Sequence, residues 1–71
     1  MRYAIVVERG PISYGAYVPD LPGCVAAAET REEVLRLVRE AIAFHLEEMR
    51  KERLAAPEPS SSAEYVQVAA A

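Results

Sequence analysis

Few side chains in this sequence could act as a nucleophile, a general base or a metal ligand. Cys24 is the only cysteine, His45 the only histidine and Asp20 the only aspartate. A thiolate nucleophile needs a neighbouring base, yet Cys24 opens a predicted strand and His45 lies on the apolar stripe of a long predicted helix. A structural zinc site needs about four cysteine or histidine ligands. We therefore expect no catalytic residue, no metal site and no cofactor.

Carboxylates and glycines give no stronger signal for chemistry. A two-metal nuclease needs several carboxylates in one cleft, but Asp20 lies in a proline-rich turn and most glutamates fall on the solvent side of the predicted helix. The three glycines lack the spacing of a phosphate-binding loop. We interpret Cys24 as a small buried hydrophobe and His45 as a residue of the core edge or of an interface, with a pH-sensitive contact or a ligand role as the alternative.

Composition limits the class of protein and its partners. The chain has 71 residues, of which 52% are hydrophobic and 27% charged, so it is expected to fold as one small domain. Its net charge of -3 argues against unaided binding of nucleic acid and favours a basic protein as partner. A single cysteine fits a reducing cytoplasm. The longest apolar runs are far shorter than the roughly 18 residues of a membrane span, so we expect a cytoplasmic protein without a membrane segment.

Three strands and a sharp turn are predicted in the first part of the chain. Residues 2–8, 14–18 and 24–28 are rich in strand-forming side chains, although the alanines make the third strand the weakest. Pro19, Asp20, Pro22 and Gly23 lie between the second and third strands, and we interpret these four as turn determinants. Two prolines fix φ and remove backbone donors, while Gly23 permits positive φ.

A helix of about 24 residues follows, and a fourth strand is predicted after it. Thr30 and Glu33 have the spacing of a capping box at the helix start. The helix carries one apolar stripe along about five turns and is expected to end before residue 57, where a proline-rich connector begins. Residues 63–68 have the composition of a strand. We therefore predict one domain over residues 1–68 and a frayed tail over residues 69–71.

This element order predicts an α+β fold, β-β-β-α-β, with strand order 3-2-1-4 and the helix on one face of the sheet. One helix covers one face only, so the other face is expected to stay partly bare and to mark a protein contact. The fourth strand would be an open edge, which makes Tyr65, Val66 and Val68 candidate contacts and predicts a dimer or tetramer. The helix is longer than the sheet, so its end near Glu47, Glu48 and Met49 is a second candidate contact surface.

A turn motif, a helix cap and two later pieces together carry a family resemblance. They read Tyr14-x-Ala16-Tyr17-Val18-Pro19-Asp20-Leu21-Pro22-Gly23-Cys24, Thr30-x-x-Glu33, Glu40-Ala41-Ile42 and Pro57-x-Pro59. In this combination the sequence resembles the HicB-like antitoxins of type II toxin-antitoxin systems, of the stand-alone UPF0150 type. The resemblance implies a truncated ribonuclease H-like sheet. It also implies binding to a small basic HicA-type toxin that cleaves messenger RNA, by covering the toxin's RNA surface and catalytic histidine.

Two other functions stay open beside the antitoxin. One is a stand-alone oligomeric protein-binding or scaffold module of the same fold without a toxin partner. The other is a residual nuclease related to ribonuclease H, which cleavage of labelled RNA with magnesium or manganese would reveal. Many members of the family continue into a helix-turn-helix or ribbon-helix-helix segment, whereas this sequence ends at Ala71. Direct nucleic-acid binding by this chain is therefore not expected.

Overall fold

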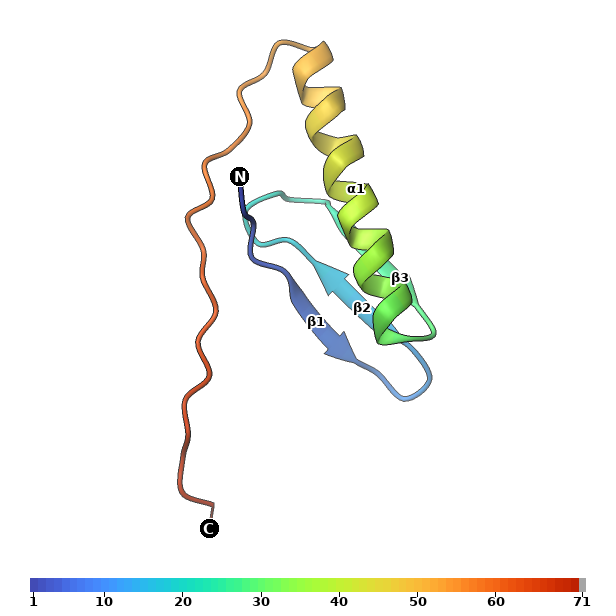
Figure 1. Ribbon diagram of the computed structural model, residues 1–71, viewed down its shortest axis with the longest axis vertical. Coiled ribbons are helices and arrows are strands. Elements are labelled where there is room, and N and C mark those ends of the chain that lie inside the picture. Colours follow the sequence, from blue (N-terminus) through green and yellow to red (C-terminus); the bar gives the residue numbers. More distant parts are fainter. Residues whose placement is uncertain (71) are drawn as a thin grey trace.

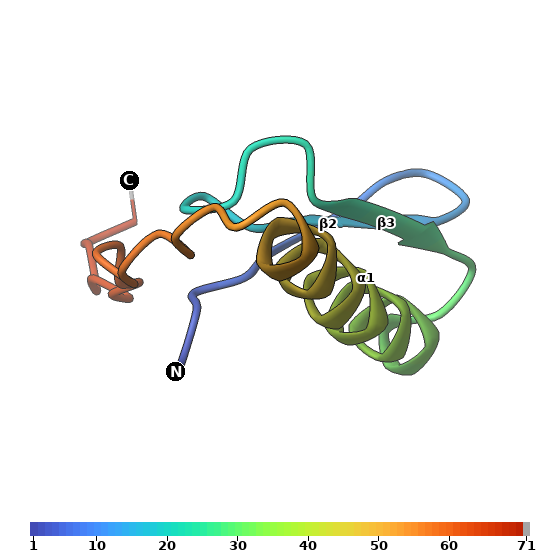
Figure 2. The ribbon, with the colours of Figure 1, turned by 90° about the horizontal axis from the view of Figure 1, so that it is seen from above.

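The computed structural model describes residues 1–70, which form a three-stranded sheet covered by one helix. The elements are β1 (Val6–Arg9), β2 (Tyr14–Tyr17), β3 (Val25–Ala28) and α1 (Arg31–Lys51). The sheet is antiparallel with the order β1-β2-β3, and α1 packs on one of its faces (Figures 1 and 2). The α+β class, the three strands and the single helix are confirmed, although each strand has only four residues.

The strand register divides the sheet into a covered face and an open face. On the covered face, Val7 pairs with Ala16, which pairs with Ala26, and all three belong to the core that packs under α1. On the other face, Val6 pairs with Tyr17, which pairs with Val25. Tyr17 is 41% exposed and Val25 is 62% exposed. The expected bare face is therefore present, and it carries an apolar row across all three strands.

The turn between β2 and β3 contributes a fully buried side chain to the core between the sheet and the helix. Leu21 is fully buried and contacts the core formed with Ala16, Val18 and the helix residues Val34 and Val38. Burial of one leucine side chain contributes about 1.5–3 kcal/mol. In a domain of this size that is a large part of the total stability. The turn is therefore a part of the core and not only a connection.

Two successive tight turns place Leu21 in the core. The Leu21 amide donates to the Val18 carbonyl at 3.0 Å, and the Cys24 amide donates to the Leu21 carbonyl at 3.1 Å. Pro22 and Gly23 are the central residues of the second turn. Gly23 has a φ of 84°, the left-handed value that a type II turn requires at this position and that glycine adopts without strain. The Val18 amide closes the whole segment by donating to the Cys24 carbonyl at 3.2 Å.

Helix α1 begins at its predicted cap but ends earlier than expected. The Thr30 hydroxyl accepts a hydrogen bond from the Glu33 amide at 3.1 Å. The Glu33 carboxylate does not return a bond to Thr30 and pairs instead with Arg36. At the other end, Arg53 has a φ of 58° and the Leu54 amide donates to the Met49 carbonyl at 2.8 Å. This left-handed cap stops α1 after 21 residues, before the prolines that were expected to end it.

The chain after α1 forms an extended C-terminal arm, residues 55–70, and no fourth strand. Figure 1 shows the arm running beside the sheet in the same direction as β1. Within the described residues the sheet has three strands, and all of residues 60–70 are exposed. The predicted strand over residues 63–68 and the order 3-2-1-4 are therefore not formed in the single chain. Of the predicted tail, residue 71 lies outside the described residues.

The helix extends past the sheet, as its length predicted. Twenty-one helical residues span about 32 Å, whereas a four-residue strand spans about 13 Å. Figure 1 shows the C-terminal half of α1 beyond the ends of the strands. No helix in residues 1–70 is long and apolar enough to span a membrane.

Candidate protein-binding surfaces

The only aspartate fastens the C-terminal arm to the turn that precedes β3. The Asp20 carboxylate accepts hydrogen bonds from the Ser60 and Ser61 amides at 2.8 and 2.9 Å, and from their hydroxyls at 3.2 and 2.8 Å. We call this set of four bonds the Asp20 clasp. The bonds lower the pKa of Asp20 from 3.8 to about 2, with the Ser61 amide as the largest cause. Asp20 is therefore a structural anion held by the arm, and a poor general base.

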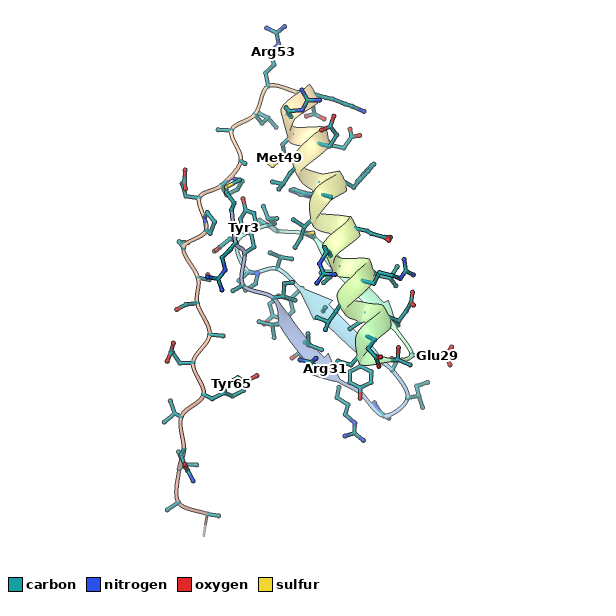
Figure 3. The ribbon with its side chains drawn as sticks, viewed as in Figure 1. Tyr3, Glu29, Arg31, Met49, Arg53 and Tyr65 are labelled. Carbon is teal, nitrogen blue, oxygen red and sulfur yellow. The ribbon has the colours of Figure 1, made fainter. Side chains whose placement is uncertain are left out.

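A second bond holds the arm closer to the helix. The Tyr3 hydroxyl donates to the Pro57 carbonyl at 2.6 Å, and Figure 3 shows Tyr3 between the arm and the rest of the molecule. Together with the Asp20 clasp, this bond fixes residues 57–61. The residues that follow leave the body of the protein without a further hydrogen bond among those described.

A slot separates the free edge of β1 from the arm. Its wider part is a cavity of about 370 Å³ lined by residues 2–5 on one side and residues 61–63 on the other. A second cavity of about 240 Å³ continues along β1 and is lined by Val7, Arg9, Arg31 and Tyr65, among others. Figure 3 shows the Tyr65 side chain pointing from the arm toward the sheet. The arm therefore forms a wall of the slot and does not fill it.

The end of α1 carries charged side chains that are already paired. Glu47 forms two bonds to Arg50, at 2.6 and 3.1 Å, which lower the pKa of its carboxyl group. Glu48 lies 3.8 Å from Lys51. Met49 is half-buried and lies on the side of α1 that faces the arm (Figure 3). Exposed ion pairs of this kind contribute little to stability, so this surface is polar with nearly balanced charge.

The predicted contact residues lie on two separate surfaces and do not form one site. Glu47, Glu48 and Met49 lie near the end of α1, whereas Tyr65, Val66 and Val68 lie on the distal arm. These regions are at opposite ends of a molecule whose longest dimension is 51 Å (Figure 1). Tyr65 is fully exposed, and Val66 and Val68 are 79% and 77% exposed. A single partner contact that includes both groups would have to run along the whole molecule.

Sequence reasoning missed the apolar row on the open sheet face. It identified a partly bare face but did not select Val6, Tyr17 and Val25, which the register aligns across β1, β2 and β3. The sequence signal for this row was the alternation of side chains between the two faces of each strand. Only the register reveals that the three side chains are neighbours, because a shift of one residue would turn each of them to the covered face. Phe44, which is 68% exposed on α1, was also missed.

The side chains that could do chemistry are not brought together. Cys24 is buried, and burial raises the pKa of its thiol, which disfavours the reactive thiolate. His45 is half-buried on α1. In the part of the chain that the structure describes, no group of three or more histidine, cysteine or acidic residues could hold a metal ion.

Comparison with known proteins identifies a family that this chain matches. Residues 3–70 match the model of a family described as "HicB_like antitoxin of bacterial toxin-antitoxin system". The chain is 35% identical, over 66 residues, to an uncharacterized 14.9 kDa protein of Haemophilus phage HP1, covering 93% of this chain and 50% of that protein. It is 30% identical to Antitoxin HicB 2 of Photorhabdus laumondii, covering 99% of this chain and 51% of that antitoxin. The chain thus spans about half the length of these two relatives.

A solved structure is also similar. A chain of the HicA3 and HicB3 toxin-antitoxin complex superposes with a TM-score of 0.70 at 28% sequence identity, covering 84% of this chain and 70% of that chain. The similarity includes most of the sheet and helix described above. With nearly the whole chain matched by the family model, the protein belongs to the HicB-like antitoxin family of bacterial toxin-antitoxin systems.

Proposed function

We propose that this protein is a cytoplasmic antitoxin without enzymatic activity that binds a small basic, mRNA-cleaving HicA-type toxin and neutralises it by covering the toxin's active surface. Membership of the family and the similarity to a chain of a toxin-antitoxin complex support this proposal. The net charge of -3 favours a basic partner. We propose further that residues 1–68 act as one domain and that the chain does not bind nucleic acid by itself.

The observation that carries the proposal is the apolar row on the open sheet face. Val6 is half-buried, and Tyr17 and Val25 are exposed, on one surface of the sheet. Tyrosine is enriched at the centres of protein interfaces. Glu8 lies on the same face, opposite Gly15, where no side chain covers the carboxylate. An apolar centre beside a free carboxylate fits a basic protein surface.

Binding to a HicA-type toxin, sought first among the genes next to that of this protein, tests the proposal. We expect the two chains to co-purify and RNA cleavage by the toxin to stop at equimolar antitoxin. Because central interface tyrosines are worth about 2 kcal/mol or more, Tyr17→Ala should weaken binding roughly thirtyfold, measured by calorimetry. Ile12→Ala is the matched control, because Ile12 is 88% exposed in the loop after β1.

Two results discriminate between the candidate surfaces, and a third tests the function itself. Loss of affinity in Tyr17→Ala, with Ile12→Ala unchanged and both variants folded, supports the sheet face. If Glu47→Lys with Glu48→Lys is the change that weakens binding, the end of α1 is the contact. A full-length protein that neither binds nor inhibits the toxin would contradict the proposed function and leave the stand-alone oligomeric module as its replacement.

A further inference from the structure

The C-terminal arm makes the molecule more extended than a compact chain of this length. A compact chain of 71 residues has a radius of gyration of about 11 Å, whereas the Cα atoms of this one give 14.2 Å. The arm accounts for the difference, because it runs along the outside of the molecule (Figure 1). Its bonds to the body end at Ser61, and every described residue beyond is exposed.

The exposed part of the arm has the composition of a strand that lacks its sheet. Tyr65, Val66 and Val68 are strand-forming side chains, and each is more than three-quarters exposed. The arm has no lysine or arginine to keep another strand away. An extended apolar segment of this kind is suited to strand addition at a free sheet edge.

A free edge of that kind exists on the same molecule. β1 pairs with β2 on one side only, and on its other side lies the slot. The arm of the same chain lines this slot with residues 61–63 and Tyr65. Because the Asp20 clasp fixes Ser60 and Ser61, the arm leaves the body as the outer wall of the slot. The edge of β1 therefore stays open to a strand from elsewhere.

Charge selects which strand fits. The two cavities of the slot are lined by Arg2, Arg9 and Arg31 and by no acidic residue. The arm carries Glu58 and Glu64 and no basic residue. A basic toxin would bring like charge to this edge, whereas the arm of another copy brings opposite charge. Ligand and receptor are thus present on every chain, which is the condition for a reciprocal two-fold contact.

We propose that two copies of this chain exchange their C-terminal arms, residues 63–68 of each pairing as a strand with the free edge of β1 of the other. The exchange gives each sheet a fourth strand beside β1 and so produces the order 3-2-1-4 with the last strand supplied in trans. It leaves the open face with Val6, Tyr17 and Val25 free. The proposal does not depend on toxin binding.

The mass and the amide protection of the full-length protein alone test this exchange. At micromolar concentration, light scattering should give twice the 7.8 kDa mass of one chain. Hydrogen exchange should show protection of the amides in residues 65–68 that is lost on dilution to the monomer. Val66→Asp with Val68→Asp should return the mass to that of one chain, because the carboxylates cannot be buried against a strand edge. Both residues are exposed in the single chain, so the fold should survive, as circular dichroism will verify.

Ile12→Asp is the control, because it places the same charge on an exposed side chain outside the arm, and its mass should equal that of the unmodified protein. Three outcomes would overturn the exchange: a monomer at micromolar concentration, a dimer that Val66→Asp with Val68→Asp leaves intact, or protection of residues 65–68 in a monomer, which would mean pairing with the chain's own β1. None of these results involves the toxin, so they are separate from a failure of the proposed function.

Discussion

Two neighbouring residues, Asp20 and Leu21, connect the turn after β2 to different parts of the molecule. Leu21 is fully buried in the core, whereas Asp20 holds the arm through Ser60 and Ser61. The sequence predicted a rigid turn here because proline and glycine act locally. It did not predict the clasp, because the serines are 40 and 41 residues away and hydrogen bonds at such separations leave no local pattern.

The clasp should open in acid, below the usual range for a carboxyl group. The folded pKa of Asp20 is about 2 and lies below its ordinary value of 3.8. Folding therefore favours the charged form, so the clasp contributes stability that is fully present above about pH 4 and is lost as the pH falls through about 2. An NMR titration of the Asp20 carboxyl carbon, followed together with the Ser60 and Ser61 amides, should show one shared transition near pH 2.

Serine variants provide the control for this titration. Ser61→Ala removes one hydroxyl donor but keeps the amide donor, so the Asp20 pKa should rise part of the way toward 3.8. Ser62→Ala removes a hydroxyl that is not part of the clasp and should leave the titration midpoint of Asp20 unchanged. A midpoint near 3.8 in the unmodified protein would show that the arm is not fastened in solution.

At the scale of elements, strands and helix start were predictable from sequence because their signals are local. β-branched and aromatic side chains mark β1 and β2, and Thr30 marks the start of α1. The fourth strand was not predictable to the same degree. Residues 63–68 have strand-forming composition, but a strand exists only where an edge pairs with it, and that edge is not given by the segment itself.

The end of α1 offers a prediction at this scale. Arg53 adopts the left-handed conformation of the cap, which costs a residue with a side chain about 1 kcal/mol relative to glycine. Arg53→Gly should therefore stabilise the protein by roughly 0.5–1 kcal/mol, seen as a rise of a few degrees in the melting temperature.

A glycine substitution inside the helix is the control, and it should destabilise the protein. Arg50→Gly places glycine within α1, where it costs about 1 kcal/mol, and it also removes the bonds to Glu47. If both glycine variants lower the melting temperature, the chain does not end α1 through a left-handed Arg53.

At the scale of the whole molecule, charge and shape distinguish two surfaces, the open sheet face and the slot beside β1. The chain is acidic overall, yet the slot beside β1 is lined by arginines. Under the proposals above, the open sheet face would bind the basic toxin while the slot and arm bind a second copy. Composition predicted the basic partner, but it averages over the surface. The local reversal of charge became visible only when the fold brought Arg9 and Arg31 to one edge.

Toxin binding should depend on salt through its association rate. If the net charge of -3 steers a basic toxin, raising the ionic strength from about 0.1 M to 1 M shortens the screening length from about 10 to 3 Å. The association rate should then fall by tenfold or more while the dissociation rate changes little, as measured by stopped-flow fluorescence. An association rate that is the same at both salt concentrations would contradict electrostatic steering.

The Asp20 clasp also has a mechanical consequence. It joins residues 60 and 61 directly to the turn between β2 and β3, which closes a loop that contains the whole of α1. Tension applied at the C-terminus is therefore transmitted to the sheet through Asp20. The helix does not bear this force while the clasp is closed. A fused protein or an immobilising surface attached beyond residue 70 would pull on Leu21 and its neighbours in the core, and the clasp would be the first link to break.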